Sequence, residues 1–205
     1  MLSYLLGSIP TGFLVAKAKG VDIRSVGSGN IGATNVFRIL GKAAGIFVLT
    51  ADAVKGALAV LVVAPMAAKM GSSGEAFLQH FPALAGICAI LGHNYTCWLK
   101  FKGGKGIATT AGVFAALAPA AFGIALATWL VVFAASRYVS LASIVAAVAL
   151  PLAVWLTGNG GLLIGVSVSL GGLAIYKHKA NIQRLLAGTE NRIGAKKPEP
   201  PETKT

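Results

Sequence analysis

The sequence predicts an all-α integral membrane protein with about seven transmembrane helices, some of them short. Of its 205 residues, 56% are hydrophobic and 12% are charged, and the mean hydropathy is +0.76. A soluble domain carries about 25% charged residues, and a helix needs about 20 apolar residues to cross a bilayer. The apolar stretches lie at about 2–16, 43–66, 81–99, 107–135, 139–157 and 161–176.

Two of these stretches are not simple single spans. The first, 2–16, is short and contains Gly7 and Pro10. It is open whether this segment is tilted, packs inside the bundle, or lacks some starting residues. The stretch 107–135 is long for one helix and short for two full spans.

The basic residues resolve the second ambiguity, because basic connections lie on the cytoplasmic side. The loop 100–106 carries three lysines, and Arg137 follows the ambiguous stretch. Both share one side only if 107–135 crosses an even number of times. We therefore expect two short helices that turn near Ala118-Pro119 and do not each cross the whole hydrocarbon. The N-terminus is then outside and the C-terminus cytoplasmic.

The remaining connections complete this topology. Thr157-Gly-Asn-Gly160 has the chemistry of a tight outside turn, and 67–80, with Gly71-Ser-Ser-Gly74, is the second outside loop. Residues 1–193 are expected to form a single membrane domain, and 194–205 a disordered cytoplasmic tail.

The formal charge of +12 bears on the partners of the chain. Nucleic-acid binding is one source of such an excess, but the apolar bulk leaves no room for a soluble basic domain. Basic residues on cytoplasmic loops fit better. Membrane lipid is therefore an expected partner, and nucleic acid is not.

The first polar motif is Gly27-Ser-Gly-Asn-Ile-Gly-Ala-Thr-Asn35, followed by Arg38. Glycines let backbone N–H groups approach an oxyanion, and arginine binds phosphate bidentately. Glycine and asparagine alone favour an ordinary connection between helices. The nearby Arg38 and Lys42 shift the balance to an anion site, although anionic lipid headgroups also attract such residues.

The second motif is Lys100-Phe-Lys-Gly-Gly-Lys-Gly106. Glycines on both sides of Lys105 expose its backbone and let its ammonium reach inward. The motif is not a Walker A loop, because Gly106 stands where Ser or Thr is required. A mere cytoplasmic marker would need the lysines but not the three glycines.

The third motif is Lys177-His-Lys-Ala-Asn-Ile-Gln-Arg184. On a helix, His178, Asn181 and Arg184 fall on one side and present a titratable group, an amide and a guanidinium to the same space. An amphipathic helix lying on lipid headgroups is the alternative. Ser140 and Ser143 add hydroxyls at the start of another span.

Ionisable residues also lie inside apolar stretches. Asp52 and Lys55 share a helix face and are expected to form a structural pair that also shapes the pocket near the cytoplasmic boundary. A lone histidine in an apolar stretch, such as His93, is more often a packing residue than a catalyst, although intramembrane ionisable groups are functional by default. The sequence has no Gly-x-Ser-x-Gly elbow and no metal-ligand cluster. A site of cations and hydrogen-bond donors suits a substrate that arrives already activated.

These motifs resemble those of the membrane-integral acyl-phosphate:glycerol-3-phosphate acyltransferases of bacterial phospholipid synthesis. The matching segments are Gly27–Asn35 with Arg38, His93 with Lys102-Gly-Gly-Lys-Gly106, and His178-x-x-Asn181-Ile-x-Arg184 with Gly188-Thr-Glu190. The segments Gly7-Ser-Ile-Pro10 and Arg137-Tyr-Val-Ser140 match as well. The chain departs from the family in a slightly shorter start and in Lys42, where some members carry an arginine that recognises anions bidentately.

The resemblance implies seven spans in the bacterial inner membrane, with the active site on the cytoplasmic side. It implies transfer of a fatty acyl group from acyl phosphate to the 1-hydroxyl of sn-glycerol 3-phosphate, as the first step of membrane phospholipid synthesis. The products are 1-acylglycerol 3-phosphate (lysophosphatidate) and phosphate. It implies no cofactor and no metal, and it suggests functional coupling to the enzyme that makes acyl phosphate.

The resemblance also suggests roles for individual residues. Catalysis is assigned to Ser28, Lys105, His178 and Asn181. The acyl-phosphate head is assigned to Gly27, Ser28, Gly29, Asn30, Gly32, Thr34, Asn35 and Arg38. Glycerol 3-phosphate is assigned to Lys42, Gly103, Gly104, Lys105, Ser143, His178, Asn181 and Glu190. The acyl chain is expected in a groove between spans that opens toward lipid.

Two questions stay open at this point. The base that takes the hydroxyl proton is either His178 or a non-bridging oxygen of the substrate's phosphate. Glu190 alternatively orients the loops through an ion pair with Arg184 or Lys179. The rival functions are a transporter of organic phosphates, which needs polar residues through the membrane depth, and a lipid-binding scaffold, which needs no Gly-Gly-Lys-Gly loop.

Overall fold

The structure is a computed structural model and describes residues 1–70 and 78–194. All regular elements in these two ranges are helical. The first part of the chain forms α1 (Leu2–Ser8), α2 (Thr11–Ala18), α3 (Ala33–Leu40), α4 (Lys42–Leu58), the π-helical segment η1 (Ala59–Val63), α5 (Ala64–Met70) and α7 (Phe81–Asn94). The second part forms the 3₁₀ turn η2 (Cys97–Leu99), α8 (Ile107–Leu117), α9 (Pro119–Ser136), α10 (Val139–Leu156), α11 (Gly160–Lys177) and α12 (Lys179–Leu186).

Within the described ranges, four helical segments are long and apolar enough to cross a membrane. They are Lys42–Lys69, with 28 residues, and the three 18-residue helices α9, α10 and α11. The segments Leu2–Ala18 and Ile107–Leu117 are apolar but shorter, and α7 has 14 residues. Each predicted apolar stretch is thus helical, while the count of seven spans stays a prediction.

The stretch 107–135 divides into two helices where the sequence predicted. Helix α8 ends at Leu117, Ala118 leaves the helical conformation, and α9 begins at Pro119. Proline favours the first position of a helix, because its missing N–H would be unpaired there anyway. The expectation of two short helices holds for α8 but is wrong for α9, which reaches spanning length.

The first apolar stretch is broken at Ile9-Pro10 and packs against another helix. Helices α1 and α7 approach closely, because a Cβ on Gly7 would overlap the Ala89 carbonyl and one on Gly92 would overlap the Tyr4 carbonyl. Of the three explanations for this stretch, packing within the bundle is the one that the contacts support.

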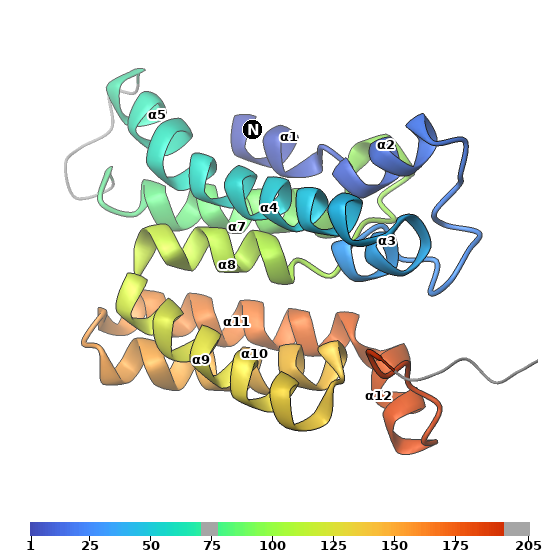
Figure 1. Ribbon diagram of the computed structural model, residues 1–205. Helices are drawn as coiled ribbons and strands as arrows, with labels where there is room; N and C mark the ends of the chain where they lie inside the picture. Colours follow the sequence, from blue (N-terminus) through green and yellow to red (C-terminus); the bar gives the residue numbers. More distant parts are fainter. Residues whose placement is uncertain (71–77, 195–205) are drawn as a thin grey trace, which may run out of the picture.

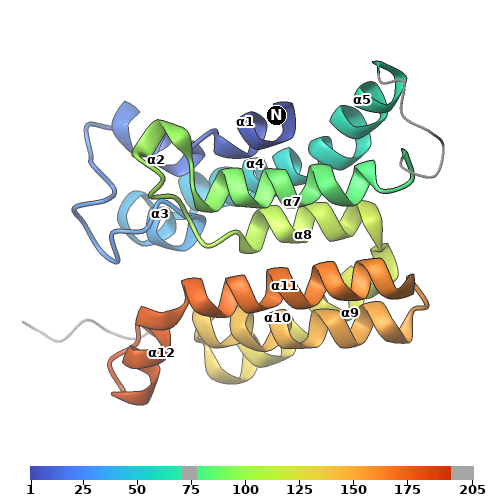
Figure 2. The ribbon, with the colours of Figure 1, turned by 180° about the vertical axis from the view of Figure 1, so that it is seen from behind.

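The helices form two layers (Figures 1 and 2). One layer contains α1 to α5, α7 and α8, the other contains α9, α10 and α11, and α12 follows α11 at one end. Both layers contribute to one apolar core, which is built from Ile90, Val113, Phe114, Ala121, Leu150, Val154 and Leu170, among others. Packing of α8, α9 and α11 into this core fixes the rotation of each helix and therefore the direction of its polar residues.

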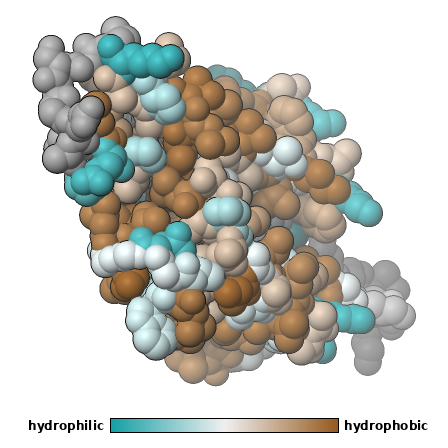
Figure 3. Space-filling view, turned by 90° about the vertical axis from the view of Figure 1, so that its left-hand side faces the viewer, coloured by the Kyte–Doolittle hydropathy of each residue, from teal (hydrophilic) through white to brown (hydrophobic). Residues whose placement is uncertain are grey.

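The basic connections gather at one end of the bundle. The segments before α3, between α7 and α8, and after α11 all lie there, together with the α9–α10 connection at Arg137 (Figure 1). The connections 117–119 and 157–160 lie at the opposite end, where hydrophobic side chains cover much of the surface (Figure 3). The sequence predicted an outside loop containing Gly71–Gly74 and a disordered tail. Residues 71–74 and the tail from residue 195 lie outside the described residues.

Candidate active site

The third motif is folded around the carboxylate of Glu190. Helix α12 presents Asn181 and Arg184 on one side, and the chain returns past Gly188, whose φ is +69°. Glu190 Oε1 accepts hydrogen bonds from Asn181 Nδ2 at 2.8 Å and Ser140 Oγ at 3.0 Å. Its Oε2 accepts from Arg184 Nε at 2.7 Å. The carboxylate therefore holds helix α12 against the start of α10.

The second motif meets the third at Lys105. Its Nζ donates a hydrogen bond to Asn181 Oδ1, so one amide links Lys105 to Glu190. Helix α8 begins directly after Gly106, whose φ of +83° directs the chain from the loop into the helix. Residues 76 positions apart in the sequence are thereby joined at one point.

Arg38 completes a cluster of three cations around one carboxylate. The half-buried guanidinium interacts electrostatically with Glu190 and Arg184, and also with Lys105. We call the set Arg38, Lys105, His178, Asn181, Arg184 and Glu190 the cation cluster. Three cations that interact with one carboxylate leave an excess of positive charge, which favours a bound anion.

The pKa values in the cation cluster are shifted by burial and by charge. Burial lowers the pKa of Lys105 to about 8, with Arg184 and Arg38 lowering it further and Glu190 opposing them. Burial and the nearby Lys105 lower the pKa of His178 to about 4. Burial raises the pKa of Glu190, but hydrogen bonds from Asn181, Arg184 and Ser140 outweigh this effect and hold it below its usual value. At neutral pH, His178 is therefore uncharged and Glu190 ionised.

The tautomer of His178 follows from its surroundings. Its Nδ1 lies 2.7 Å from the carbonyl oxygen of Ala174, one turn earlier in α11. A carbonyl oxygen only accepts hydrogen bonds, so Nδ1 carries the proton. The neutral ring then has its lone pair on Nε2, which is able to accept a hydrogen bond or a proton from a substrate.

The first motif forms a loop organised by Asn35. The buried Asn35 side chain accepts a hydrogen bond from the Ser28 N–H at 2.9 Å and donates to the carbonyls of Ile23 and Val26. The amide is thus fully used in shaping the loop, while the Ser28 side chain is exposed. The loop precedes α3, which carries Arg38 toward the cation cluster.

A sequence model of a protein family described as glycerol-3-phosphate acyltransferase matches residues 1–188 of the chain. The chain belongs to the glycerol-3-phosphate acyltransferase family. It is 50% identical over 189 residues to the glycerol-3-phosphate acyltransferase of Geotalea daltonii, covering 92% of this chain and 93% of that protein. It is 54% identical over 193 residues to that of Geobacter metallireducens, covering 94% and 95%.

Solved structures agree with this membership. The chain resembles the crystal structure of PlsY, an integral membrane glycerol 3-phosphate acyltransferase, in its glycerol 3-phosphate form, with 42% identity and a TM-score of 0.83 over 94% of this chain and 92% of that one. The lysophosphatidic acid form of PlsY gives 41% identity and a TM-score of 0.80, with the same coverage. The chain is therefore a multi-pass membrane protein and an acyltransferase.

Several residues that the family resemblance assigned to substrates lie apart from the cation cluster or are otherwise engaged. Ser143 Oγ donates to the Val139 carbonyl at 2.8 Å and accepts from Trp129 Nε1 at 3.2 Å. Lys42 is exposed, and its side chain makes no hydrogen bond or ion pair with the described residues. Asn30 Oδ1 accepts from the Gly32 N–H, within its own loop. Their substrate contacts stay predictions.

The remaining predicted residues divide between the loop and the cluster. Gly27, Gly29 and Thr34 belong to the first-motif loop or the first turn of α3, and the two glycines have φ values of +62° and +68°. Gly103 and Gly104 precede Lys105 and pack against α7. The predicted Asp52–Lys55 pair is confirmed, with 2.8 Å between Oδ1 and Nζ. The ion pair of Glu190 is with Arg184 rather than Lys179.

Two contributors were given no role by the sequence analysis. Ser140 had been noted as a further hydroxyl and as part of a matching segment, but its bond to Glu190 depends on α10 lying beside α12. Lys177 donates to the Asn94 carbonyl at 3.0 Å and lies over the Tyr95 ring. It ties the end of α11 to the end of α7, and its position beside His178 was the only available signal. Within the described ranges, no group of three or more His, Cys, Asp or Glu residues is arranged to hold a metal ion.

Proposed function

We propose that this protein transfers a fatty acyl group from acyl phosphate to the 1-hydroxyl of sn-glycerol 3-phosphate. The products are 1-acylglycerol 3-phosphate (lysophosphatidate) and phosphate, and the reaction begins membrane phospholipid synthesis. The cation cluster is the observation that carries the proposal, because both substrates bring phosphate groups to one reaction. The names of the relatives, which specify glycerol 3-phosphate, support the acceptor.

The chemistry needs little more than positioning and charge. The hydroxyl oxygen of glycerol 3-phosphate bonds to the acyl carbonyl carbon, and the bond from that carbon to the phosphate oxygen breaks. Phosphate is already a good leaving group, so holding the reactants together and stabilising the anions supplies most of the catalysis. We place the acceptor's phosphate against Lys105 and Asn181, and the leaving phosphate between Arg38 and the first-motif loop with Ser28.

We infer that the proton passes to a non-bridging phosphate oxygen and not to His178. A general base works best when its pKa is near the operating pH, and the pKa of His178 is about 4. The lone pair on Nε2 still accepts a hydrogen bond and thereby orients the reacting hydroxyl. His178 then has a positioning role toward the nucleophile.

The acyl chain requires an apolar surface. A groove of about 420 Å³ lies between α7 and α11 and is lined by Ile87, Gly161, Leu162, Gly165, Val166, Ser169 and Leu170. Leu170 is eight residues before His178 in the chain, about 12 Å along a helix. We propose that the distal part of the chain lies in this groove.

The membrane orientation is part of the proposal. Basic connections gather at the end that carries the cation cluster, and such connections face the cytoplasm. We therefore place the site at the cytoplasmic face of the bacterial inner membrane, with seven spans, the N-terminus outside and the C-terminus inside. A donor made in the cytoplasm and delivered to the membrane suits functional coupling with the enzyme that makes acyl phosphate.

The test is an assay of the purified protein with palmitoyl phosphate and glycerol 3-phosphate, measuring both phosphate release and lysophosphatidate. Palmitoyl-CoA replaces the donor in parallel. We expect equal amounts of phosphate and lysophosphatidate when palmitoyl phosphate is the donor, and no product when palmitoyl-CoA is the donor. Turnover with palmitoyl-CoA only would refute the donor, and binding of glycerol 3-phosphate without turnover from either donor would favour a transporter.

The pH dependence gives a second test. The value of kcat/KM for glycerol 3-phosphate is expected to fall as the pH rises through about 8, because the pKa of Lys105 is lowered to about 8 and the neutral amine no longer attracts phosphate. The second pKa of the substrate's phosphate is about 6, so its titration does not cause this fall near pH 8, the alkaline limb of the profile. Lys105→Arg, which stays charged, should remove the limb. A limb unchanged in that variant would belong to another group.

Replacement of His178 by asparagine tests the route of the proton. We expect kcat to fall by less than about 100-fold, the lower range for loss of a general base, with the pH profile retaining its shape. Steady-state kinetics from pH 5 to 9 measures both quantities. A loss of about 10⁴-fold, together with the loss of any fall in kcat between pH 7 and pH 5, would identify His178 as the base.

A further inference from the structure

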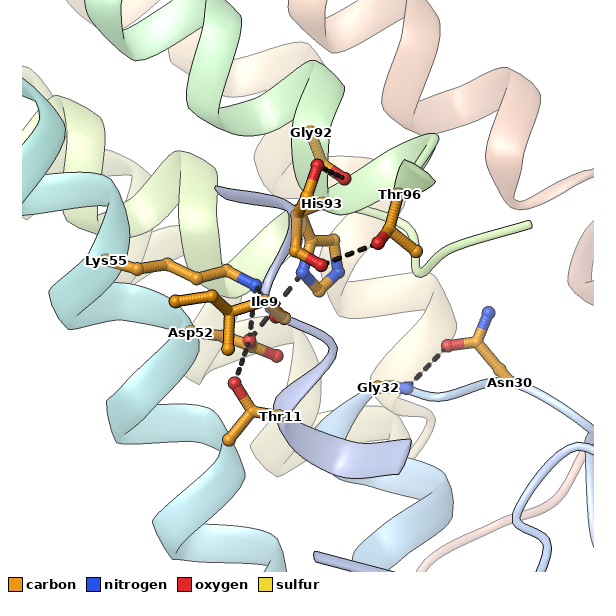
Figure 4. A network of polar contacts seen from close by, with 10 residues as sticks. Ile9, Thr11, Asn30, Gly32, Asp52, Lys55, Gly92, His93 and Thr96 are labelled. Atoms are coloured by element: carbon orange, nitrogen blue, oxygen red, sulfur yellow. Dashed lines mark hydrogen bonds and ion pairs between the residues drawn. The ribbon is translucent and has the colours of Figure 1, made fainter. Parts of the chain in front are cut away.

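A cluster of buried ionisable residues lies between α4, α7 and the break before α2 (Figure 4). Lys55 Nζ lies 2.8 Å from Asp52 Oδ1 and donates to the Ile9 carbonyl at 2.9 Å. Thr11 Oγ1 donates to the same Asp52 oxygen at 3.2 Å. The side chain of His93 points toward this oxygen, with Nδ1 at 3.6 Å. Asp52, Lys55 and His93 are 2%, 4% and 6% exposed.

Stability alone does not explain such a cluster. Desolvating a charged pair costs about as much as the pair gains, and well-packed apolar residues would stabilise the same place equally well. Buried charges do, however, restrict the geometry of what surrounds them, and ionisable residues within apolar spans commonly serve function. Among the described residues, no hydrogen bond or ion pair joins these side chains to the cation cluster, so a role in the site must pass through another element.

The second-motif loop is that element, and it rests on His93. The N–H of Gly104 donates to the His93 carbonyl at 3.0 Å, and the N–H of Gly103 to the Asn94 carbonyl at 3.2 Å. The α-carbon of Gly104 lies directly on the imidazole, since an added Cβ would overlap ring atoms of His93. Glycine is required at both positions because the backbone touches the support. Lys105 is the next residue, so the position of the ring determines where its side chain begins.

We propose that Asp52, Lys55 and His93 are positioning residues for the acyl transfer proposed above: they hold the imidazole that supports Gly103–Gly104 and thereby place the ammonium of Lys105 in the site. Asp52 Oδ1, which is fixed by Lys55 and Thr11, lies 3.6 Å from Nδ1 at one edge of the ring, and the ring contacts Gly104 on its other side. Lys177, bonded to the Asn94 carbonyl, holds the same support from the C-terminal layer. This arrangement links the intramembrane pair to the phosphate-binding lysine.

Two variants and one control test this role. The double variant Asp52→Asn with Lys55→Met removes both charges together, so no buried charge is left unpaired, and nearly preserves side-chain shape. His93→Ala removes the support while leaving the ion pair. Ser167→Ala is the control, because it removes a buried hydroxyl whose partner is the Ile164 carbonyl within α11.

The first measurement is the pH dependence of reductive methylation of Lys105, followed by peptide mass spectrometry. Exposed Lys102 serves as an internal reference. The midpoint for Lys105 is expected near pH 8 in the wild type and in Ser167→Ala, and nearer its ordinary value of 10.5 in both test variants. In the two test variants, but not in Ser167→Ala, KM for glycerol 3-phosphate should rise more than kcat falls, with about a 100-fold loss in kcat/KM.

The outcomes separate the proposals. An unchanged Lys105 midpoint and KM in either folded test variant would overturn the positioning role, even if thermal stability falls. His93→Ala decides the question if the double variant does not fold. The labelling needs no substrate, so it also works if the wild type proves unable to transfer acyl groups. That result would refute the proposed function, while a shifted Lys105 midpoint in the test variants would still support the placement of Lys105 by His93.

Discussion

Replacing Lys105 by methionine is expected to lower kcat/KM for glycerol 3-phosphate by about 10³-fold, the upper range for loss of one stabilising donor in an active site. The substitution removes the cation that we propose binds the acceptor's phosphate, together with the donor to Asn181 Oδ1. Methionine has similar length and is easily accommodated in the half-buried site. Steady-state kinetics with palmitoyl phosphate measures the effect.

Lys102→Met is the matched control for this prediction. Lys102 lies in the same loop and carries the same charge, but it is exposed. Its replacement should change kcat/KM by less than about two-fold, because exposed charges are strongly screened. Equal losses in the two variants would mean that the loop attracts substrates only through its total charge, and would remove Lys105 from the site.

Replacing Glu190 by glutamine is expected to lower kcat/KM by about 100-fold, because misplacement of the groups that it holds is costly. Glutamine keeps one oxygen for Asn181 and Ser140 but turns an amide toward Arg184, which needs an acceptor. A second effect is electrostatic. Glu190 raises the pKa of Lys105, so its loss should lower that pKa and move the alkaline limb of kcat/KM below pH 8.

Asp22→Asn serves as the control for Glu190→Gln. It also removes an acidic residue, but Asp22 is exposed and paired with Arg24 outside the cation cluster. Both the rate and the alkaline limb should be unchanged in this variant. If Glu190→Gln loses activity while its limb stays at about 8, the carboxylate acts only by holding the groups around it and not on the charge of Lys105.

The sequence indicated the helices well because each is a local pattern. The apolar stretches, the break at Ala118-Pro119 and the pairing of Asp52 with Lys55 depend on residues a few positions apart. Length was harder to predict. Helix α9 was expected to be short, but it begins directly at Pro119 and reaches spanning length. The stretch 81–99 ends its helix at Asn94 because the chain turns there to receive the second-motif loop.

The site residues were predicted less evenly than the helices. Lys105, His178, Asn181 and Glu190 stand in motifs, and the structure brings them together with Arg38. Composition could not separate residues that shape a loop from those that face its ligand. Asn35 has the same donors and acceptors in either role, and only its bonds to Ser28, Ile23 and Val26 reveal that it holds the loop.

The sequence by itself determined the membrane class, the helical segments, the three polar motifs and the family, because these follow from composition and from spacing along the chain. Only the tertiary structure decided that Ser140 supports Glu190, that Lys105 meets Asn181, and that His93 carries Gly104. Each of these contacts joins different helices or a helix and a distant loop. Their geometry depends on how the helices rotate and pack around the shared core, which no local pattern records.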